Sequence, residues 1–206
     1  MPSLTHENRL RAAGHTWIAG IDEAGRGPLA GPVSVAAVVL PAKYRHKILN
    51  DSKQLTPETR ARLYEEITSD PRIRWHCEMI SVTEIDRINI LQATWVGMRR
   101  CALALDPLPC VALIDGMPVR DFPLQQVALV KGDTLSYSIA AASIIAKVTR
   151  DRFMVDLALQ YPGYGFEIHK GYATPGHQAS LKNLGPCPEH RRSFGRIAQM
   201  ELGLAL

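Results

Sequence analysis

Short runs of apolar residues alternate along the chain with longer periodic segments. Trp17–Ile21 and the valine-rich Val33–Leu40 have the composition of buried strands. Residues 73–79 alternate apolar and polar side chains, which predicts a half-buried strand. Residues 1–16 are mainly polar and are expected to form a loose lead-in. Residues 22–32 hold three glycines and two prolines, which predicts a loop.

Three segments carry helix signals. Residues 56–69 open with Thr-Pro, an N-cap followed by proline at the first helical position. Residues 81–105 open with a Ser-x-x-Glu capping box. Residues 138–160, Ala-rich at first, predict a third and longer helix. Short apolar runs at 111–114 and 127–130 predict two more buried strands.

This order of elements predicts an α/β domain with a mixed sheet. The first three strands are expected to form an antiparallel meander. The later strands are expected to join in parallel through helical crossovers. A length of 206 residues fits one domain with at most a small appendage.

Composition and charge add a modest hint about the partner. The net charge is +4, and residues 131–206 hold nine Lys and Arg against six Asp and Glu. A basic C-terminal part favours a polyanionic partner. No leader or long uncharged apolar run is found, and Cys77, Cys101 and Cys110 lie among apolar residues as free core thiols do. We therefore expect a soluble cytoplasmic protein without a membrane partner.

Carboxylates directly follow three of the predicted strands. Asp22 and Glu23 follow the first, Asp115 follows the strand at 111–114, and Asp133 comes after the strand at 127–130. Functional groups of open α/β sheets collect beyond the carboxyl ends of strands. A strand that ends in Asp is also common as a cap or turn, so any one of these acids is more often structural than catalytic. Three such strand ends together favour a functional cluster.

Four converging carboxylates would repel one another unless cations compensate their charge. Hard divalent ions with oxygen ligands, Mg²⁺ or Mn²⁺, are the usual remedy. Two such ions serve phosphodiester hydrolysis, one activating a water and the other stabilising the leaving 3′-oxygen. The pattern therefore predicts two-metal chemistry.

A glycine-rich segment and a polar helix face are candidates for contact with an anionic substrate. Gly25, Arg26 and Gly27 could form an anion-binding nest or simply a tight turn between strands. Lys131, two residues before Asp133, could neutralise part of the carboxylate charge. Further candidates share one face of the long helix: Ser143, Lys147 and Arg150. That face could also be merely solvated.

Aromatic residues alternate with cations after residue 160, as in surfaces that stack on sugars or bases. His169, Lys170 and Tyr172 are the candidates for substrate contact, whereas Tyr164 and Phe166 are better explained as anchors in the core. The His-Arg-Arg run at 190–192 would form a compact basic patch.

Taken together, these residues resemble the type 2 ribonuclease H family, specifically its bacterial ribonuclease HII branch. The resemblance spans nearly the whole chain. The matching blocks are GIDEAGRGPLAGPV at 20–33, DSKQL at 51–55, LIDG at 113–116, KGDTLSYSIAAASIIAKVTRDR at 131–152, YPGYGFEIHKGYATPGH at 161–177 and RRSF at 191–194.

The resemblance implies a ribonuclease H-like fold: a mixed five-stranded sheet flanked by helices, with a small helical C-terminal part. Residues 1–160 would be the catalytic domain, and 161–206 a substrate-contacting segment packed on it. The four metal-binding acids would be Asp22, Glu23, Asp115 and Asp133. The implied substrate contacts come from Gly25-Arg26-Gly27 at the ribose 2′-hydroxyl and flanking phosphates, from Tyr172 stacked on the next sugar, and from Lys53 of the DSKQL block.

The implied activity is endonucleolytic. Family members hydrolyse the RNA strand of RNA–DNA hybrids and cut 5′ of ribonucleotides embedded in duplex DNA, leaving 3′-hydroxyl and 5′-phosphate ends. We expect a monomer. Some relatives carry a C-terminal peptide for the sliding clamp. The end QMELGLAL has a glutamine and leucines but no terminal aromatic pair, so support for clamp binding is weak.

Three other functions remain open. An exonuclease or a resolvase on the same fold would also gather acids at strand ends, but an exonuclease needs a nucleic-acid end. A non-catalytic nucleic-acid binding module is disfavoured because bare carboxylates repel phosphate. A small-molecule phosphatase would use a closed pocket rather than an open basic groove.

Overall fold

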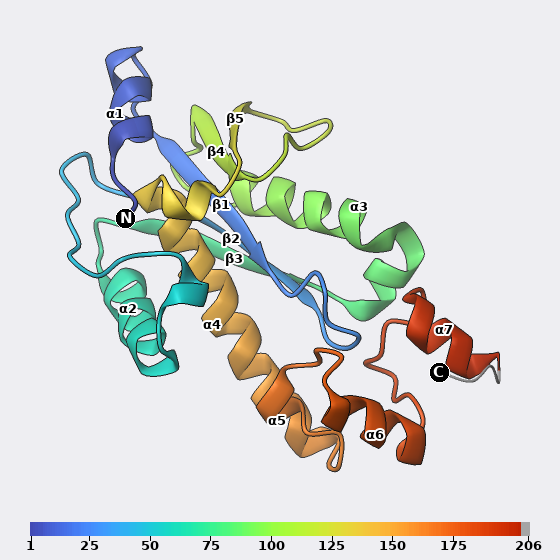
Figure 1. The fold of residues 1–206 in the computed structure, drawn as a ribbon. Coiled ribbons are helices and arrows are strands. Elements are labelled where there is room, and N and C mark those ends of the chain that lie inside the picture. The colour runs from blue at the N-terminus through green and yellow to red at the C-terminus, as the bar shows by residue number, and fades with distance from the viewer. Residues whose placement is uncertain (203–206) are drawn as a thin grey trace.

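A five-stranded mixed sheet forms the centre of the molecule (Figure 1). The computed structural model describes residues 1–202. The strand order is β3-β2-β1-β4-β5, in which the first three strands form an antiparallel meander and the last two join in parallel. The bounds are β1 (Ile18–Ala24), β2 (Val33–Val39), β3 (Arg74–Ile80), β4 (Val111–Asp115) and β5 (Gln125–Leu129). The predicted α/β class and mixed sheet are confirmed.

Helices cover both faces of the sheet. The helices are α1 (Thr5–Ala12), α2 (Pro57–Ser69), α3 (Val82–Leu103), α4 (Tyr137–Gln160), α5 (Phe166–His169), α6 (Pro175–Leu184) and α7 (Gly195–Glu201), with 3-10 turns η1 (Ser52–Gln54) and η2 (Gly132–Thr134). The helices α2 and α4 lie on one face, and α3 lies on the other. The helices predicted from residues 56, 81 and 138 onward correspond to α2, α3 and α4.

The central strand β2 explains this layering, because its side chains alternate between the two faces. Ala36 and Val38 pack into the core formed with α2 and α4. Val35 and Ala37 pack into the core formed with α3. Every residue of β2 is buried, so its sequence is continuously apolar apart from Ser34.

The start of α4 lies unusually close to β1. A Cβ atom placed on Gly20 would lie 2.2 Å from the backbone carbonyl carbon of Ser138, which is too close for any side chain. Gly20 therefore lets the helix approach the strand backbone. The N-terminus of α4 is capped by Ser136, whose side chain accepts a hydrogen bond from the Ile139 N–H. This contact brings the η2–α4 junction close to β1.

The C-terminal helices α5 and α6 lie at the far end of α4, and α7 lies farther from it, on the side of α3 (Figure 1). They share an apolar cluster with that end of α4 and with residues 29–30, which lie between β1 and β2. Tyr164 and Phe166 belong to this cluster, and Phe166 is fully buried. The expectation that these two aromatic residues anchor the segment in a core is confirmed.

The expectation of a loose lead-in at residues 1–16 is wrong, because residues 5–12 form α1. A buried carboxylate docks this helix together with one apolar side chain, Leu10, which packs against Ile18 and Val111. Glu7 is fully buried, and its Oε1 accepts hydrogen bonds from Ser138 N–H (2.9 Å) and from the hydroxyl groups of Ser136 (2.6 Å) and Ser138 (2.5 Å). A carboxylate at the N-terminus of α4 also interacts favourably with the helix dipole.

Three further details differ from the sequence-based expectations. Asp22 and Glu23 lie inside β1, since pairing with β2 continues to Ala24. The parallel strands β4 and β5 are joined by residues 116–124 without a helix. The helix α3 is interrupted at Asn89 (φ 66°, ψ 163°), whose side chain accepts a hydrogen bond from the backbone N–H three residues later.

All four cysteines are free, but Cys110 is exposed rather than in the core. The expectation for Cys110 is therefore wrong, because it immediately precedes β4 instead of lying inside it. Within residues 1–202, no helix combines the length and the apolarity that crossing a lipid bilayer requires.

Candidate active site

Three carboxylates from separate segments meet at one end of the sheet. Asp22 lies on β1, Asp115 ends the neighbouring parallel strand β4, and Asp133 lies in η2 just beyond β5. One carboxylate oxygen of each lies within 4.8 Å of the others. The parallel register explains the meeting, because Ile21 pairs with Ile114 and the next residue of each strand is the acid.

Backbone hydrogen bonds fix the orientation of two of these side chains. The Glu23 N–H donates to Asp22 Oδ1 at 2.7 Å. The Gly132 N–H donates to Asp115 Oδ1 at 2.6 Å, which connects the tip of β4 to the turn that carries Asp133. Hydrogen bonds of this length to a carboxylate are strong.

The three acids are crowded and poorly hydrated. Burial, then the charges of Glu23 and Asp115, raise the pKa of Asp22 well above its ordinary value. Burial, then the charges of Asp115 and Asp51, raise the pKa of Asp133 to about 6. Both shifts mean that a second negative charge is costly here without a cation.

Glu23, the fourth acid of the sequence analysis, lies outside this group of three. Its Oε1 is 3.3 Å from Arg26 Nη1, and the two side chains form an ion pair. Burial raises the pKa of Glu23, while Arg26 lowers it and Asp115 raises it further. Glu23 is therefore close enough to feel the cluster but is held by the adjacent loop.

Lys53 supplies positive charge to the cluster. Burial lowers its pKa, but the charges of Asp22, Asp51, Asp133 and Asp115 raise it, and the net shift is upward. Lys131 was expected to neutralise these acids, but the charge that lowers the pKa of Asp133 is that of Lys53. Lys131 itself is exposed at the start of η2, and its part in neutralising the acids stays a prediction.

Asp51 is a further acid close to Asp133 that was not predicted from the sequence. Its side chain is nearly buried, accepts hydrogen bonds from the Lys53 N–H and the Gln54 side chain, and contacts Asp133. In sequence, an Asp before Ser-Lys-Gln is typical of a turn or cap, and that role is present too. Only the fold reveals its proximity to Asp133.

A cavity of about 290 Å³ adjoins Glu23 and contains most of the predicted substrate contacts. From the predicted list it is lined by Gly25, Arg26, Gly27, Lys53, Ser143, Lys147 and Tyr172. A Cβ on Gly27 would meet only the Tyr172 ring, at 3.9 Å, so the absent side chain leaves a gap between loop and ring. Tyr172 is 44% exposed and is accessible to a bound molecule.

Other residues predicted to contact substrate are occupied within the protein. Arg150 is 1% exposed and donates to backbone carbonyls, so the expectation that it contacts phosphate is wrong. His169 also makes internal bonds: its Nε2 is 2.7 Å from Tyr164 O, and its Nδ1 accepts from the Gly171 N–H. The expected basic patch at 190–192 is not a surface patch, because His190 and Arg191 are fully buried.

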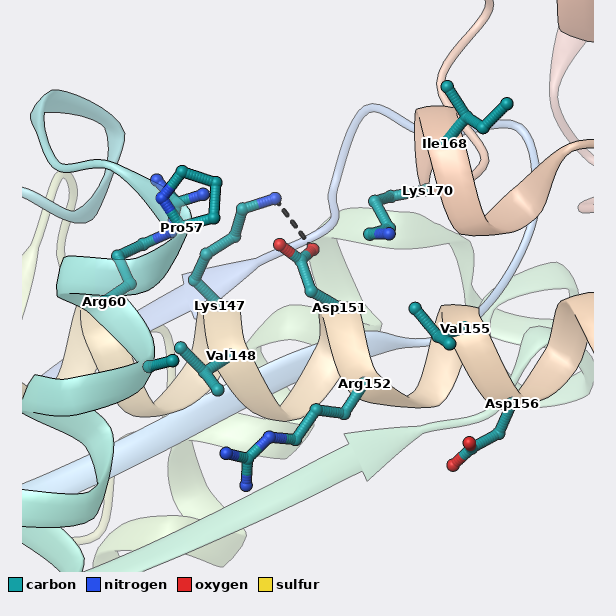
Figure 2. Close-up of a pocket in the computed structure, with 11 residues that line it drawn as sticks. Pro57, Arg60, Lys147, Val148, Asp151, Arg152, Val155, Asp156, Ile168 and Lys170 are labelled. Carbon is teal, nitrogen blue, oxygen red and sulfur yellow. Dashed lines mark hydrogen bonds and ion pairs between the residues drawn. The ribbon is translucent and has the colours of Figure 1, made fainter.

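A larger cavity of about 560 Å³ lies beside the first, between α2, α4 and α5 (Figure 2). Lys147 lines both cavities and forms an ion pair with Asp151 at 2.8 Å. Figure 2 shows Lys147 projecting from α4 toward Asp151 and Lys170 on the α5 side of the cavity, which Val148 and Val155 also line. The lining of this groove combines four basic residues with two acids: Arg60, Lys147, Arg152 and Lys170 against Asp151 and Asp156.

Comparison with known proteins agrees with the fold and shows the family. The sequence profile described as Ribonuclease HII matches residues 19–197. A ribonuclease HII from Xanthomonas campestris is 52% identical over 98% of this chain and 82% of its own length. Two solved archaeal structures are similar. The ribonuclease H2 of Pyrococcus horikoshii has a TM-score of 0.77 and 28% identity, covering 91% of this chain and 98% of its own.

The second archaeal structure is a PCNA:RNase HII complex from Archaeoglobus fulgidus. Its TM-score is 0.73 and its identity 29%, covering 85% of this chain and 94% of its own. Sequence similarity therefore extends across the strand tips, the glycine-rich segment and the C-terminal helices. The chain belongs to the ribonuclease HII family, whose members are hydrolytic endoribonucleases of the ribonuclease H type.

Proposed function

We propose that the chain hydrolyses the RNA strand of RNA–DNA hybrids and cuts 5′ of ribonucleotides embedded in duplex DNA. The products would be 3′-hydroxyl and 5′-phosphate ends. The observation that carries this proposal is the approach of Asp22, Asp115 and Asp133 to within 4.8 Å, beside the cavity that contains the glycine-rich segment and Tyr172.

The cluster of three carboxylates at Asp22, Asp115 and Asp133 fits hard divalent cations. Its oxygens are the ligands that Mg²⁺ and Mn²⁺ prefer. Burial, and after it the negative charges of neighbouring acids, raise the pKa values of Asp22 and Asp133, and a bound cation would offset both effects. We assign Asp22, Glu23, Asp115 and Asp133 as ligands of two such ions. When bound, the ions would supply an activated water and stabilise the leaving 3′-oxygen.

The protein's own groups position the substrate. We assign Gly25, Arg26 and Gly27 to the 2′-hydroxyl and the flanking phosphates, and Tyr172 to stacking on the adjacent sugar. Their shared cavity supports this assignment. Lys53 would offset negative charge where a phosphate enters the acidic site.

Further backbone contacts would come from the groove beside the site. Lys147 and Lys170 line it, and their charges suit phosphates of the nucleic-acid backbone. Ser143 lies deeper: it is 4% exposed, and its hydroxyl donates to Ser52 Oγ at 2.7 Å. Its part would be to hold the DSKQL turn rather than to bind phosphate directly.

The working unit is proposed to be a monomer that acts on nucleic acid. The Archaeoglobus relative forms a complex with PCNA. For this chain, the segment that would bind a clamp is QMELGLAL at 199–206, whose last four residues lie outside the described part.

Cleavage mapping tests the proposal. Three labelled 30-base-pair substrates would be used: an RNA–DNA hybrid, a duplex with one ribonucleotide, and an all-DNA duplex, each with Mg²⁺ and with EDTA. We expect cuts 5′ of ribonucleotides, only with metal, and none in the all-DNA duplex. Cutting of all-DNA duplex at a comparable rate would contradict the proposal.

A covalently closed circular DNA with one ribonucleotide separates this activity from that of an exonuclease, which needs an end. The expected result is nicking of the circle at the ribonucleotide. Release of mononucleotides from linear DNA, with the circle left intact, would instead favour the exonuclease alternative.

A further inference from the structure

Two buried arginines lie beneath residues 25–32, hereafter the glycine loop. Arg150 comes from α4, and Arg191 comes from the segment between α6 and α7. Their exposures are 1% and 0%, and neither forms an ion pair with a carboxylate within residues 1–202. Burial lowers the pKa of both, and the charge of Arg150 lowers that of Arg191 further. Such charges need other compensation.

Backbone carbonyls of the glycine loop supply that compensation for Arg191. One planar guanidinium donates to four of them, since its N–H groups form a fixed fork. The bonds run from Nε to Gly31 O (2.9 Å), from Nη1 to Arg26 O (2.9 Å), and from Nη2 to Gly25 O (2.6 Å) and Pro32 O (3.1 Å).

Arg150 donates to further carbonyls of the same loop. Its Nε donates to Pro32 O at 2.9 Å and its Nη2 to Ala30 O at 3.1 Å. The remaining Nη1 donates at 3.0 Å to the carbonyl of Lys170, two residues before Tyr172. Arg150 therefore connects the loop to the segment that carries the tyrosine of the cavity.

The sequence of the loop is adapted to these arginines. Gly25 has φ +94°, and a Cβ there would lie 2.0 Å from Arg150 Nε. A side chain would therefore separate the loop from the guanidinium. The contact depends on glycine both for its backbone angle and for its lack of a side chain.

The carbonyl bonds determine where the N–H groups point. In a trans peptide, the carbonyl of one residue and the N–H of the next point in opposite directions. The carbonyls of Gly25 and Arg26 point inward to Arg191, so the N–H groups of Arg26 and Gly27 point outward. Neither N–H has an acceptor in the part of the chain that the structure describes.

We propose that Arg191, supported by Arg150, is a positioning residue that aims the N–H groups of Arg26 and Gly27 into the cavity and thereby sets the selectivity for a ribonucleotide. The inference rests on the proposed contact between the glycine loop and the 2′-hydroxyl. Arg191 itself does not touch the substrate. Fixed donors of this kind bind an oxygen without reorganising, and the buried positive charge behind them favours a nearby phosphate.

The test uses Arg191→Lys and Arg191→Met in an Asp115→Asn background, which prevents cutting. Fluorescence anisotropy measures Kd for a duplex with one ribonucleotide and for the all-DNA duplex of the same sequence. Lysine keeps the charge but cannot form the fork. We expect both substitutions to reduce the ratio of the two affinities about tenfold, the size of one lost hydrogen bond.

Two variants protect this test from a trivial loss of folding. Leu105→Ala creates a cavity in the core against α3 and should lower the unfolding temperature while leaving the ratio unchanged. Phe194→Leu removes the ring whose centroid lies 5.1 Å from the guanidinium carbon of Arg191. The hydrogen bonds from Arg191 to the loop carbonyls should weaken without being lost, so the ratio of the two affinities should fall about threefold. If the Arg191 variants do not fold, the affinity ratio of Phe194→Leu tests the positioning role by itself, and an unchanged ratio would overturn it.

The outcomes separate this inference from the proposed function. If the parent protein has no preference for the ribonucleotide, the proposed function fails. If the parent prefers it and Arg191→Lys retains the full ratio, the positioning role is overturned. A ratio that falls equally in Leu105→Ala would also overturn it, because selectivity would then follow global stability.

Discussion

The backbone N–H of Gly132 donates a 2.6 Å hydrogen bond to Asp115 Oδ1, joining the tip of β4 to the turn that carries Asp133. One side chain thus serves two purposes, since the same carboxylate belongs to the group of three acids. A Cβ on Gly132 would lie 2.6 Å from Ile139 Cδ1, so the glycine allows the turn to pack closely. The distance between two acids is therefore set by a backbone contact.

This dual role predicts different results for two substitutions of Asp115. Asp115→Asn keeps an oxygen for the Gly132 N–H, so stability should change little while cleavage falls at least about 100-fold through loss of a charged ligand. Asp115→Ala should lose activity and also about 1–3 kcal/mol of stability, because a buried donor is left unpaired. Urea unfolding and initial cleavage rates measure the two effects. Equal stability of both variants would contradict the structural role.

Two neighbouring glycines should respond differently to alanine. Gly25→Ala introduces a side chain at positive φ and against Arg150, so it should lower the free energy of unfolding by about 2 kcal/mol or more. Gly27→Ala meets only Tyr172, at 3.9 Å, so stability should stay within about 0.5 kcal/mol. Its hybrid cleavage should still fall, because the added methyl group enters the cavity. Normal cleavage by a folded Gly27→Ala protein would count against that site.

The raised pKa of Asp133 predicts how pH affects the metal-free protein. The pKa of Asp133 in the folded protein, about 6, lies above its value in the unfolded chain. Protonated Asp133 therefore stabilises the fold at low pH, and this stability is lost as the pH rises through about 6. His177 and His190, whose pKa values are lowered by burial, act in the opposite direction. We therefore compare thermal unfolding of the parent and Asp133→Asn in EDTA from pH 4.5 to 8. The Asp133→Asn protein should become more stable relative to the parent as the pH rises. A difference in unfolding temperature that stays constant with pH would argue against the raised pKa of Asp133.

Lys147 should contribute one phosphate contact. Lys147→Ala should weaken hybrid binding and reduce the slope of log K against log salt by about 0.9 or less. The ion pair with Asp151 limits the effect, since that bond must loosen when a phosphate binds. Lys182→Ala, an exposed change on α6, serves as the control. If the slope for Lys147→Ala is unchanged, Lys147 makes no phosphate contact and serves only in its ion pair with Asp151.

The fold could be predicted from the sequence wherever burial was apolar. The valine-rich β2 and the capped helices α2 and α3 were recognisable because their patterns reflect packing and local hydrogen bonds. The helix α1 was missed because a buried carboxylate, Glu7, and a single leucine, Leu10, dock it, and one acid with one apolar residue in a polar segment gives no such pattern.

The site was predictable only in part, for a related reason. Asp22 and Asp115 could be recognised because each directly follows an apolar run, and the parallel pairing of β1 with β4 places the two acids close together. Helical spacing placed Lys147 and Arg150 on one face. It could not reveal that, of these two residues, Arg150 is buried beneath the glycine loop. Cations are usually exposed, so a guanidinium buried against carbonyls is seen only in the structure.

The central claim is that the strand-tip carboxylates together bind divalent ions. Titration calorimetry of Mn²⁺ into the metal-free protein tests it most directly, with Asp133→Asn as the site variant and the exposed Asp121→Asn as its control. We predict saturable binding in the parent and the control, weakened at least about tenfold in Asp133→Asn because a charged ligand is lost. Identical Mn²⁺ affinity in all three proteins would contradict the account.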